Sequence, residues 1–192
     1  MFKLITILSF LIIFPIAAQG LQSNLAVDQT IKPAAISQPE TTPSQVEWLK
    51  GSVAFREVSD WEGMLNWCQK WSKSEPKDAS AWHCLGYSNQ MLHHHDDAIA
   101  VYLQTVKINP EDIDGWSNLG FVYTEQNRYD EAINAYLKVL HINPEDIEAL
   151  SNLLLVYYSS GKSADAQETL QILKRLNPEK ANEVLEFVTP SK

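Results

Sequence analysis

The chain has 192 residues, of which 45% are hydrophobic and 20% charged, and its formal net charge is −9. This is the composition of an ordinary globular protein. An acidic chain has few cations with which to neutralise phosphates, and the sequence contains no stripe of Lys and Arg residues interleaved with aromatic residues. The composition therefore predicts no nucleic-acid partner.

Residues 1–20 have the layout of a secretory signal peptide, with a Lys near the start, an apolar run over 4–14, a helix-breaking Pro15 and a small-x-small site at 18–20. The apolar run is too short to cross a hydrocarbon core of about 30 Å comfortably. We therefore expect export and cleavage, and a location outside the cytoplasm, either periplasmic or secreted. The alternative is an uncleaved anchor that faces outward, because residues 16–18 would lengthen the apolar span.

Residues 21–44 contain three prolines and no sustained helical period. This pattern predicts a flexible or extended linker. With an uncleaved N-terminus, the linker would hold the following domain away from a membrane, and only in that case do we expect a membrane contact.

From about Gln45 the sequence repeats with a period of 34 residues. Four prolines mark this period, each 34 residues after the one before. The segment 109–146 opens and closes on the same Asn-Pro-Glu-Asp, and two amphipathic helical patterns lie between these signals. Such a period is typical of helix-turn-helix arrays, whose units bury their apolar faces on their neighbours. The sequence thus predicts an all-α solenoid. Its prolines are Pro76, Pro110, Pro144 and Pro178, its units are 45–78, 79–112, 113–146 and 147–180, and a capping helix and tail follow over 181–192, with the helix itself at Ala181–Val188.

Recurring columns of residues predict the core of this array. One column lies three residues before another in each first helix, which places both on one buried face. Glycine in the middle of a helix costs about 1 kcal/mol relative to alanine. We expect Gly86 and Gly120 to face Ala98 and Ala132 of the second helices, so that two helix backbones approach closely. The columns are Trp48, Trp82, Trp116 and Leu150, followed by Gly51, Leu85, Leu119 and Leu153.

These residues resemble the tetratricopeptide repeat family. The family pattern of Trp, Leu-Gly, Tyr, Ala, an aromatic residue and Pro appears in Trp116, Leu119-Gly120, Tyr123, Ala132, Tyr136 and Pro144. The resemblance covers about 45–180, is most specific over 113–146 and is weakest in the first unit. It implies a right-handed superhelix of helix pairs and a non-catalytic protein that binds other proteins.

In that family the concave surface of successive first helices binds the ligand, so the resemblance implies a groove here that is largely apolar. Only Lys50 and Arg56 are available to grip a C-terminal carboxylate, so we do not expect a carboxylate-clamp co-chaperone. The groove residues are Leu49, Val53, His83, Tyr87, Met91, Ser117, Phe121, Ser151, Leu155 and Tyr158, with the amides of Asn118 and Asn152 beside them to bond a peptide backbone.

Phe121 and Leu155 occupy the same column of consecutive repeats, with Tyr87 one repeat earlier, and we expect them to form an exposed apolar stripe. The alternative is that Phe121 packs inward and stabilises the array. Asp114 and Glu148 at the groove edge favour a ligand with basic flanks. Each carboxylate taken alone is equally well explained as a favourable charge near a helix N-terminus.

Four of the six Trp residues fall in the first unit. The favoured interpretation is a terminal cap that closes an exposed end of the array, and the alternative is an aromatic binding platform. These residues are Trp48, Trp61, Trp67 and Trp71.

Cys68 and Cys84 are the only cysteines. We expect both to be free, with Cys68 buried, although a disulfide stays open because the distance between the two Cα atoms decides it. His93, His94 and His95 fall in a turn, and three adjacent histidines rarely point at one metal. We expect no metal and no cofactor.

The sequence has no Gly-rich phosphate loop, nucleophile elbow or paired His of a zinc hydrolase, and we do not expect an enzyme. The favoured function is a non-catalytic module outside the cytoplasm that binds a peptide or helix of a partner protein, in the assembly of an envelope or secreted complex. The alternative is a membrane-tethered structural spacer or scaffold. A metal-binding or redox role ranks third.

Overall fold

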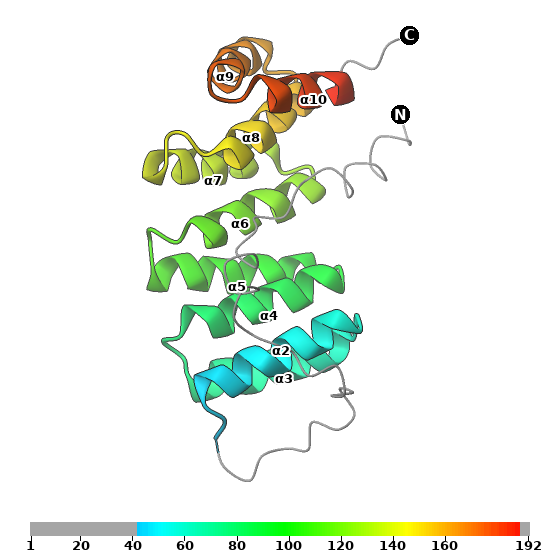
Figure 1. Ribbon diagram of the computed structural model, residues 1–192, viewed down its shortest axis with the longest axis vertical. Helices are drawn as coiled ribbons and strands as arrows, with labels where there is room; N and C mark the ends of the chain where they lie inside the picture. Colours follow the sequence, from blue (N-terminus) through cyan, green and yellow to red (C-terminus); the bar gives the residue numbers. More distant parts are fainter. Residues whose placement is uncertain (1–41, 189–192) are drawn as a thin grey trace. The chain divides into compact units, whose positions relative to one another are not determined.

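The computed structural model describes residues 42–188, and this part of the chain folds into nine helices without a strand. The first helices of the four pairs begin at residues 45, 79, 113 and 147 (Figure 1). The predicted all-α array of helix pairs is therefore confirmed. The helices are α2 (Gln45–Glu57), α3 (Trp61–Ser74), α4 (Ala79–Met91), α5 (His95–Ile108), α6 (Ile113–Glu125), α7 (Tyr129–Ile142), α8 (Ile147–Ser160), α9 (Ser163–Leu176) and α10 (Pro178–Val188).

The predicted signal peptide and all but the last three residues of the predicted linker lie outside the described residues. Among the helices of residues 42–188, none combines the length and the apolar character needed to span a membrane.

Short polar side chains before the first helices set where those helices begin. The hydroxyl of Ser44 accepts the backbone N–H of Glu47, and the Glu47 carboxylate accepts the backbone N–H of Ser44 at 2.7 Å, which together form a capping box. Asp78 caps α4 by accepting the backbone N–H of Ser80 at 2.9 Å. Asp146 caps α8 in the same way at the backbone N–H of Ala149. Each of these side chains satisfies a backbone donor that the helix leaves unpaired.

Helix α10 begins differently, because Lys180 stands where Asp146 stands one period earlier. An ammonium group cannot accept a backbone N–H. The side chain of Asn177 accepts the Lys180 N–H instead, at 2.9 Å, and Pro178 occupies the first helical position, where its missing N–H has no cost. The helix therefore starts at Pro178 and not at Ala181, where we expected the cap to begin.

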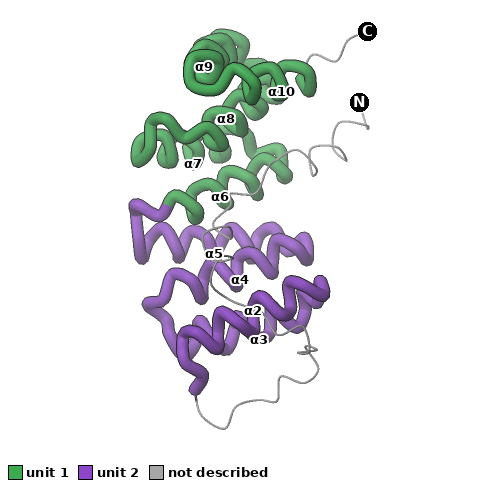
Figure 2. The backbone as a smooth tube through the Cα atoms, in the orientation of Figure 1, with its two compact units in different colours: residues 1–18, 113–192 green, residues 19–112 purple. Residues whose placement is uncertain are grey.

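The chain forms two compact units (Figure 2). In the unit that contains α2–α5, three Trp side chains, the two cysteines and Leu85 belong to the buried core. In the unit that contains α6–α10, Leu119, Tyr136, Leu154 and Leu173 are fully buried.

At the contact between the two helices of a pair, a glycine of the first helix leaves room for a tyrosine ring of the second helix. A Cβ atom built on Gly120 would lie 2.7 Å from the ring of Tyr136, and one built on Gly86 would meet the ring of Tyr102. The side chain that the missing Cβ accommodates is therefore a tyrosine of the second helix, and not the alanine that we expected. Ala98 of α5 and Ala132 of α7 are also fully buried.

Candidate functional site

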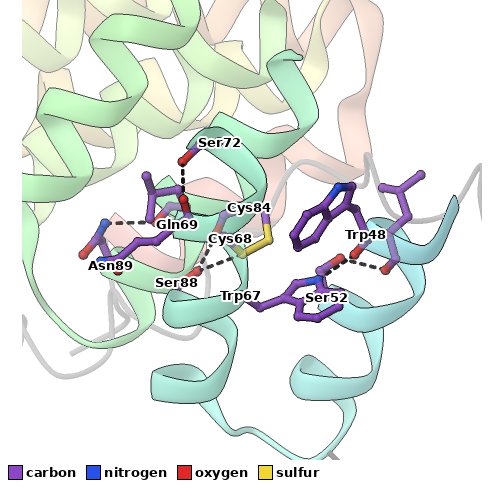
Figure 3. Close-up of a disulfide and its surroundings, with 11 residues drawn as sticks. Trp48, Ser52, Trp67, Cys68, Gln69, Ser72, Cys84, Ser88 and Asn89 are labelled. Carbon is purple, nitrogen blue, oxygen red and sulfur yellow. Dashed lines mark hydrogen bonds between the residues drawn. A yellow bond between two sulfur atoms is a disulfide. The ribbon is translucent and has the colours of Figure 1, made fainter. Parts of the chain in front are cut away.

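Cys68 and Cys84 form a disulfide bond between α3 and α4 (Figure 3). Their Cα atoms are 5.5 Å apart, within the range that a disulfide requires. Our expectation of free thiols was wrong, because the Cα separation depends on how two helices of different repeats pack. Both cysteines are buried, and the bond fastens the irregular first helix pair to the next one.

Three tryptophans of the first helix pair are buried beside this disulfide. The indole N–H of Trp67 donates to the backbone carbonyl of Trp48 at 2.9 Å. The rings of Trp48 and Trp71 stack with their centroids 6.1 Å apart. These contacts fit the terminal cap and leave Trp48, Trp67 and Trp71 unable to serve as an aromatic platform. Trp61 differs, because it is only partly buried.

Five of the predicted groove residues form two rows on α2 and α4. The members of each row are four residues apart along a helix, so each row lies on one helix face. All five are partly exposed. Leu49 of α2 and Tyr87 of α4 both pack against the tryptophan core of this unit. We name this surface the α2–α4 face, and its residues are Leu49, Val53, His83, Tyr87 and Met91.

Tyr87 has two neighbours that the sequence did not lead us to expect. The ring of Trp61 at the start of α3 meets the Tyr87 ring edge to face, with centroids 5.9 Å apart. Burial raises the pKa of the Tyr87 hydroxyl, and the nearby Arg56 guanidinium opposes that rise. The hydroxyl therefore stays protonated at neutral pH and can donate a hydrogen bond. No spacing rule pointed to Trp61, because it lies on the second helix of its pair.

His83 is held in place by a carboxylate. Its Nε2 atom lies 3.0 Å from both carboxylate oxygens of Asp112, in the turn after α5. The side chains keep 24% and 11% of their surface exposed. This pairing fixes the orientation of the imidazole on the α2–α4 face.

In the other unit, two predicted groove residues are not exposed. Phe121 retains 8% of its surface and Leu155 retains 7%. The exposed apolar stripe that we expected from these two side chains is thus contradicted. Ser151 and Asn152 are also buried, whereas Ser117, Asn118 and Tyr158 are partly exposed.

Helix α10 is one cause of this burial at α8. A cavity of about 10 Å³ lies at the contact between α8 and α10, which is roughly the space of one water molecule. Leu155 lines it together with Val184 and Phe187 of α10. The helix that we predicted as a cap therefore covers part of the α8 face that we had assigned to a ligand. The complete lining is Glu148, Ser151, Asn152 and Leu155 from α8, with Lys180, Glu183, Val184 and Phe187 from α10.

Of the three adjacent histidines, His93 and His95 meet edge to face, with ring centroids 5.7 Å apart. His93 and His94 are exposed in the turn before α5, and His95 is the first residue of that helix. Within residues 42–188, no group of three or more His, Cys, Asp or Glu side chains has an arrangement suited to a metal ion.

The comparisons with known proteins agree with the repeat pattern. Residues 113–146 match the family model of the tetratricopeptide repeat. A crystal structure of the MamA protein is 25% identical to this chain, with a TM-score of 0.64 over 72% of this chain and 76% of that one. MamA residues 41 to the end from Desulfovibrio magneticus RS-1 are 21% identical, with a TM-score of 0.67 over 74% of this chain and 82% of that chain.

A third solved structure is YrrB, described as a TPR protein with an unusual peptide-binding site. It is 16% identical, with a TM-score of 0.61 over 76% of this chain and 84% of YrrB. The comparison with curated proteins gave no match. The resemblance that the sequence suggested is confirmed by the family match and by the fold of these structures.

Proposed function

We propose, from the tetratricopeptide repeat at residues 113–146 and the helix pairs on either side of it, that this protein is a non-catalytic module outside the cytoplasm that binds a peptide or helix of a partner protein. The repeat supports the broader part of this statement, because proteins of the family are generally interaction modules without catalytic activity. The compartment, the binding surface and a role in assembling an envelope or secreted complex are our inferences.

The observation that carries the binding surface is the partly exposed α2–α4 face. Its central side chain, Tyr87, is apolar in its ring and polar at its hydroxyl, and it has Trp61 and Arg56 as neighbours. Tyr, Trp and Arg are the residue types enriched at the energetic centres of protein interfaces. Burying one large apolar side chain beneath a partner contributes about 1.5–3 kcal/mol, whereas an exposed ion pair contributes about 0–1 kcal/mol. The aromatic centre therefore dominates the binding energy that we assign to this face.

Two features support a location outside the cytoplasm. The sequence of residues 1–20 has the layout of a signal peptide, and Cys68 is bonded to Cys84. Disulfides form and persist in oxidising compartments and are rare in the cytosol. If the N-terminal segment is not cleaved, the same interaction module becomes a membrane-tethered spacer or scaffold.

The test uses Tyr87→Ala in tagged full-length protein from an exporting cell, with cross-linked partners identified by mass spectrometry. We expect the variant to lose the partner that the wild type retains, while its thermal melt stays cooperative. Leu103→Ala is the matched control, because Leu103 is 45% exposed on α5 and outside the α2–α4 face. Equal recovery of the partner by both variants would argue against this surface.

A further inference from the structure

Helix α10 covers part of the α8 surface that we had assigned to a ligand. It packs on α8 and α9 within its unit (Figure 1). Its Val184 and Phe187, three residues apart, lie at the cavity that Leu155 of α8 also lines. Residues three apart share a helix face, so α10 presents one short apolar edge to α8.

Charges accompany this apolar contact. Burial raises the pKa of the Glu148 carboxyl on α8, and the Lys180 ammonium on α10 partly offsets the rise. The Lys180 ammonium also lies 3.1 Å from the Glu183 carboxylate, and its side chain keeps only 12% of its surface exposed. Glu148, Lys180 and Glu183 line the same cavity, so α10 brings both a basic and an acidic group to Glu148, and the Glu183 carboxylate also raises the pKa of Glu148.

The fit between the two helices is incomplete. Only Ala181 and Val184 of the 11 residues of α10 are buried, and a cavity of about 10 Å³ stays open at the contact. A helix of this length is marginal in water without tertiary contacts. Elements with few buried apolar side chains are the ones that open locally while the rest of a protein stays folded.

We propose that α10 is a displaceable occupant of a helix-binding surface on α8, formed by Glu148, Ser151, Asn152 and Leu155. In place of α10, the surface accepts a short amphipathic helix of a partner protein. That helix carries two apolar residues spaced three apart and a basic residue four positions before the first of them. That pattern is the one of Lys180, Val184 and Phe187. This inference rests on the proposed function in one respect, namely that the protein binds a protein ligand. The surface on α8 is separate from the α2–α4 face.

The first test measures amide hydrogen exchange along the full chain. We expect the amides of α10 to exchange at least about 100-fold faster than those in the middle of α8, because α10 opens without global unfolding. Equal protection of α10 and α8, lost only in global unfolding, would overturn the proposal.

The second test uses a fluorescein-labelled peptide of residues 178–192 and the full-length Val184→Glu variant, whose own α10 is undocked by a charge at a buried position. Fluorescence anisotropy should show saturable binding at least about tenfold tighter to the variant than to the wild type, because the resident helix competes in the wild type. A peptide that itself carries Val184→Glu is the control and should not bind.

Peptide that binds wild type and variant equally, or binds neither, would overturn the proposal. Phe187→Glu provides the same test if Val184→Glu disturbs folding, and an α10 that stays protected from exchange in the Phe187→Glu variant would also contradict displacement. Tyr87→Ala should leave peptide binding unchanged. A failure of the α2–α4 face is thereby distinguished from a failure of the α8 surface.

Discussion

At the scale of single residues, the contacts between neighbouring helices depend on glycines, which have no side chain, and on two cysteines that are covalently joined. Gly120 leaves room for the fully buried ring of Tyr136, and the same arrangement recurs at Gly86 and Tyr102. At the first repeat boundary, the disulfide between Cys68 and Cys84 adds a covalent link. Close packing at these points makes the array sensitive to a single methyl group.

Gly120→Ala should destabilise the protein. Its new Cβ would lie 2.7 Å from the buried Tyr136 ring, and overpacking of this kind costs about 1–3 kcal/mol, against a gain of about 1 kcal/mol in helix propensity. Urea unfolding should therefore show a net loss of up to about 2 kcal/mol. Combination with Tyr136→Leu should recover much of that loss.

Gly161→Ala is the control for the double-mutant comparison of Gly120→Ala with Tyr136→Leu. Gly161 has a φ of 75° and no neighbour within 4 Å of a built Cβ atom, so alanine there is strained by the backbone alone. Its effect should add to that of Tyr136→Leu. Strict additivity for Gly120→Ala as well would show that the ring contact is not the cause of its effect.

Replacing both cysteines with alanine should lower the free energy of unfolding by about 3 kcal/mol, because the disulfide closes a loop with a sequence separation of 16 residues. Denaturant unfolding of the oxidised wild type and of the Cys68→Ala/Cys84→Ala variant measures the difference. Reductant should lower the stability of the wild type and leave the variant unchanged. Labelling of both thiols in denatured, unreduced wild type would contradict the bond.

At the scale of secondary-structure elements, the residue at each helix start determines how the next helix is placed. Asp146 caps α8 from the turn that follows Pro144. Helix α8 therefore begins at Ile147 and keeps the 34-residue period that starts α6 at Ile113. Lys180 at the equivalent position cannot cap, and α10 begins directly at Pro178. Its early start leaves Lys180 inside the helix, where it lines the same cavity as Glu148 of α8.

Glu148→Gln should stabilise the protein at neutral pH. Burial raises the folded-state pKa of this carboxyl above its unfolded value, so the protonated form favours folding and its contribution is lost as the pH rises through the folded pKa. The variant should melt at a higher temperature than the wild type at about pH 7, and at the same temperature near pH 3. Glu145→Gln, at an exposed position of the preceding turn, is the control and should change little at either pH.

At the scale of the whole molecule, the sequence predicted the features that recur in every repeat. It did not predict contacts that occur at a single position. The prolines and the Trp, Leu-Gly and Tyr columns revealed the helix pairs, because each repeat uses the same local chemistry. The burial of Phe121 and Leu155 and the bond between Cys68 and Cys84 depend on distances between separate helices. No periodicity encodes those distances. Of the expected groove, five residues on α2 and α4 remain partly exposed, as do Ser117, Asn118 and Tyr158 in the other unit.

The N-terminus sets the context in which all of these surfaces act, and its fate is the last prediction. The short apolar run and small-x-small site of residues 1–20 predict cleavage by a signal peptidase. Intact-mass measurement on protein from an exporting cell should therefore find a chain that begins near Leu21 and carries the Cys68–Cys84 bond. A chain that still begins at Met1 and is extracted only by detergent would establish the membrane tether in its place. The α2–α4 face would then act at a membrane surface, at a distance limited by the length of residues 21–44.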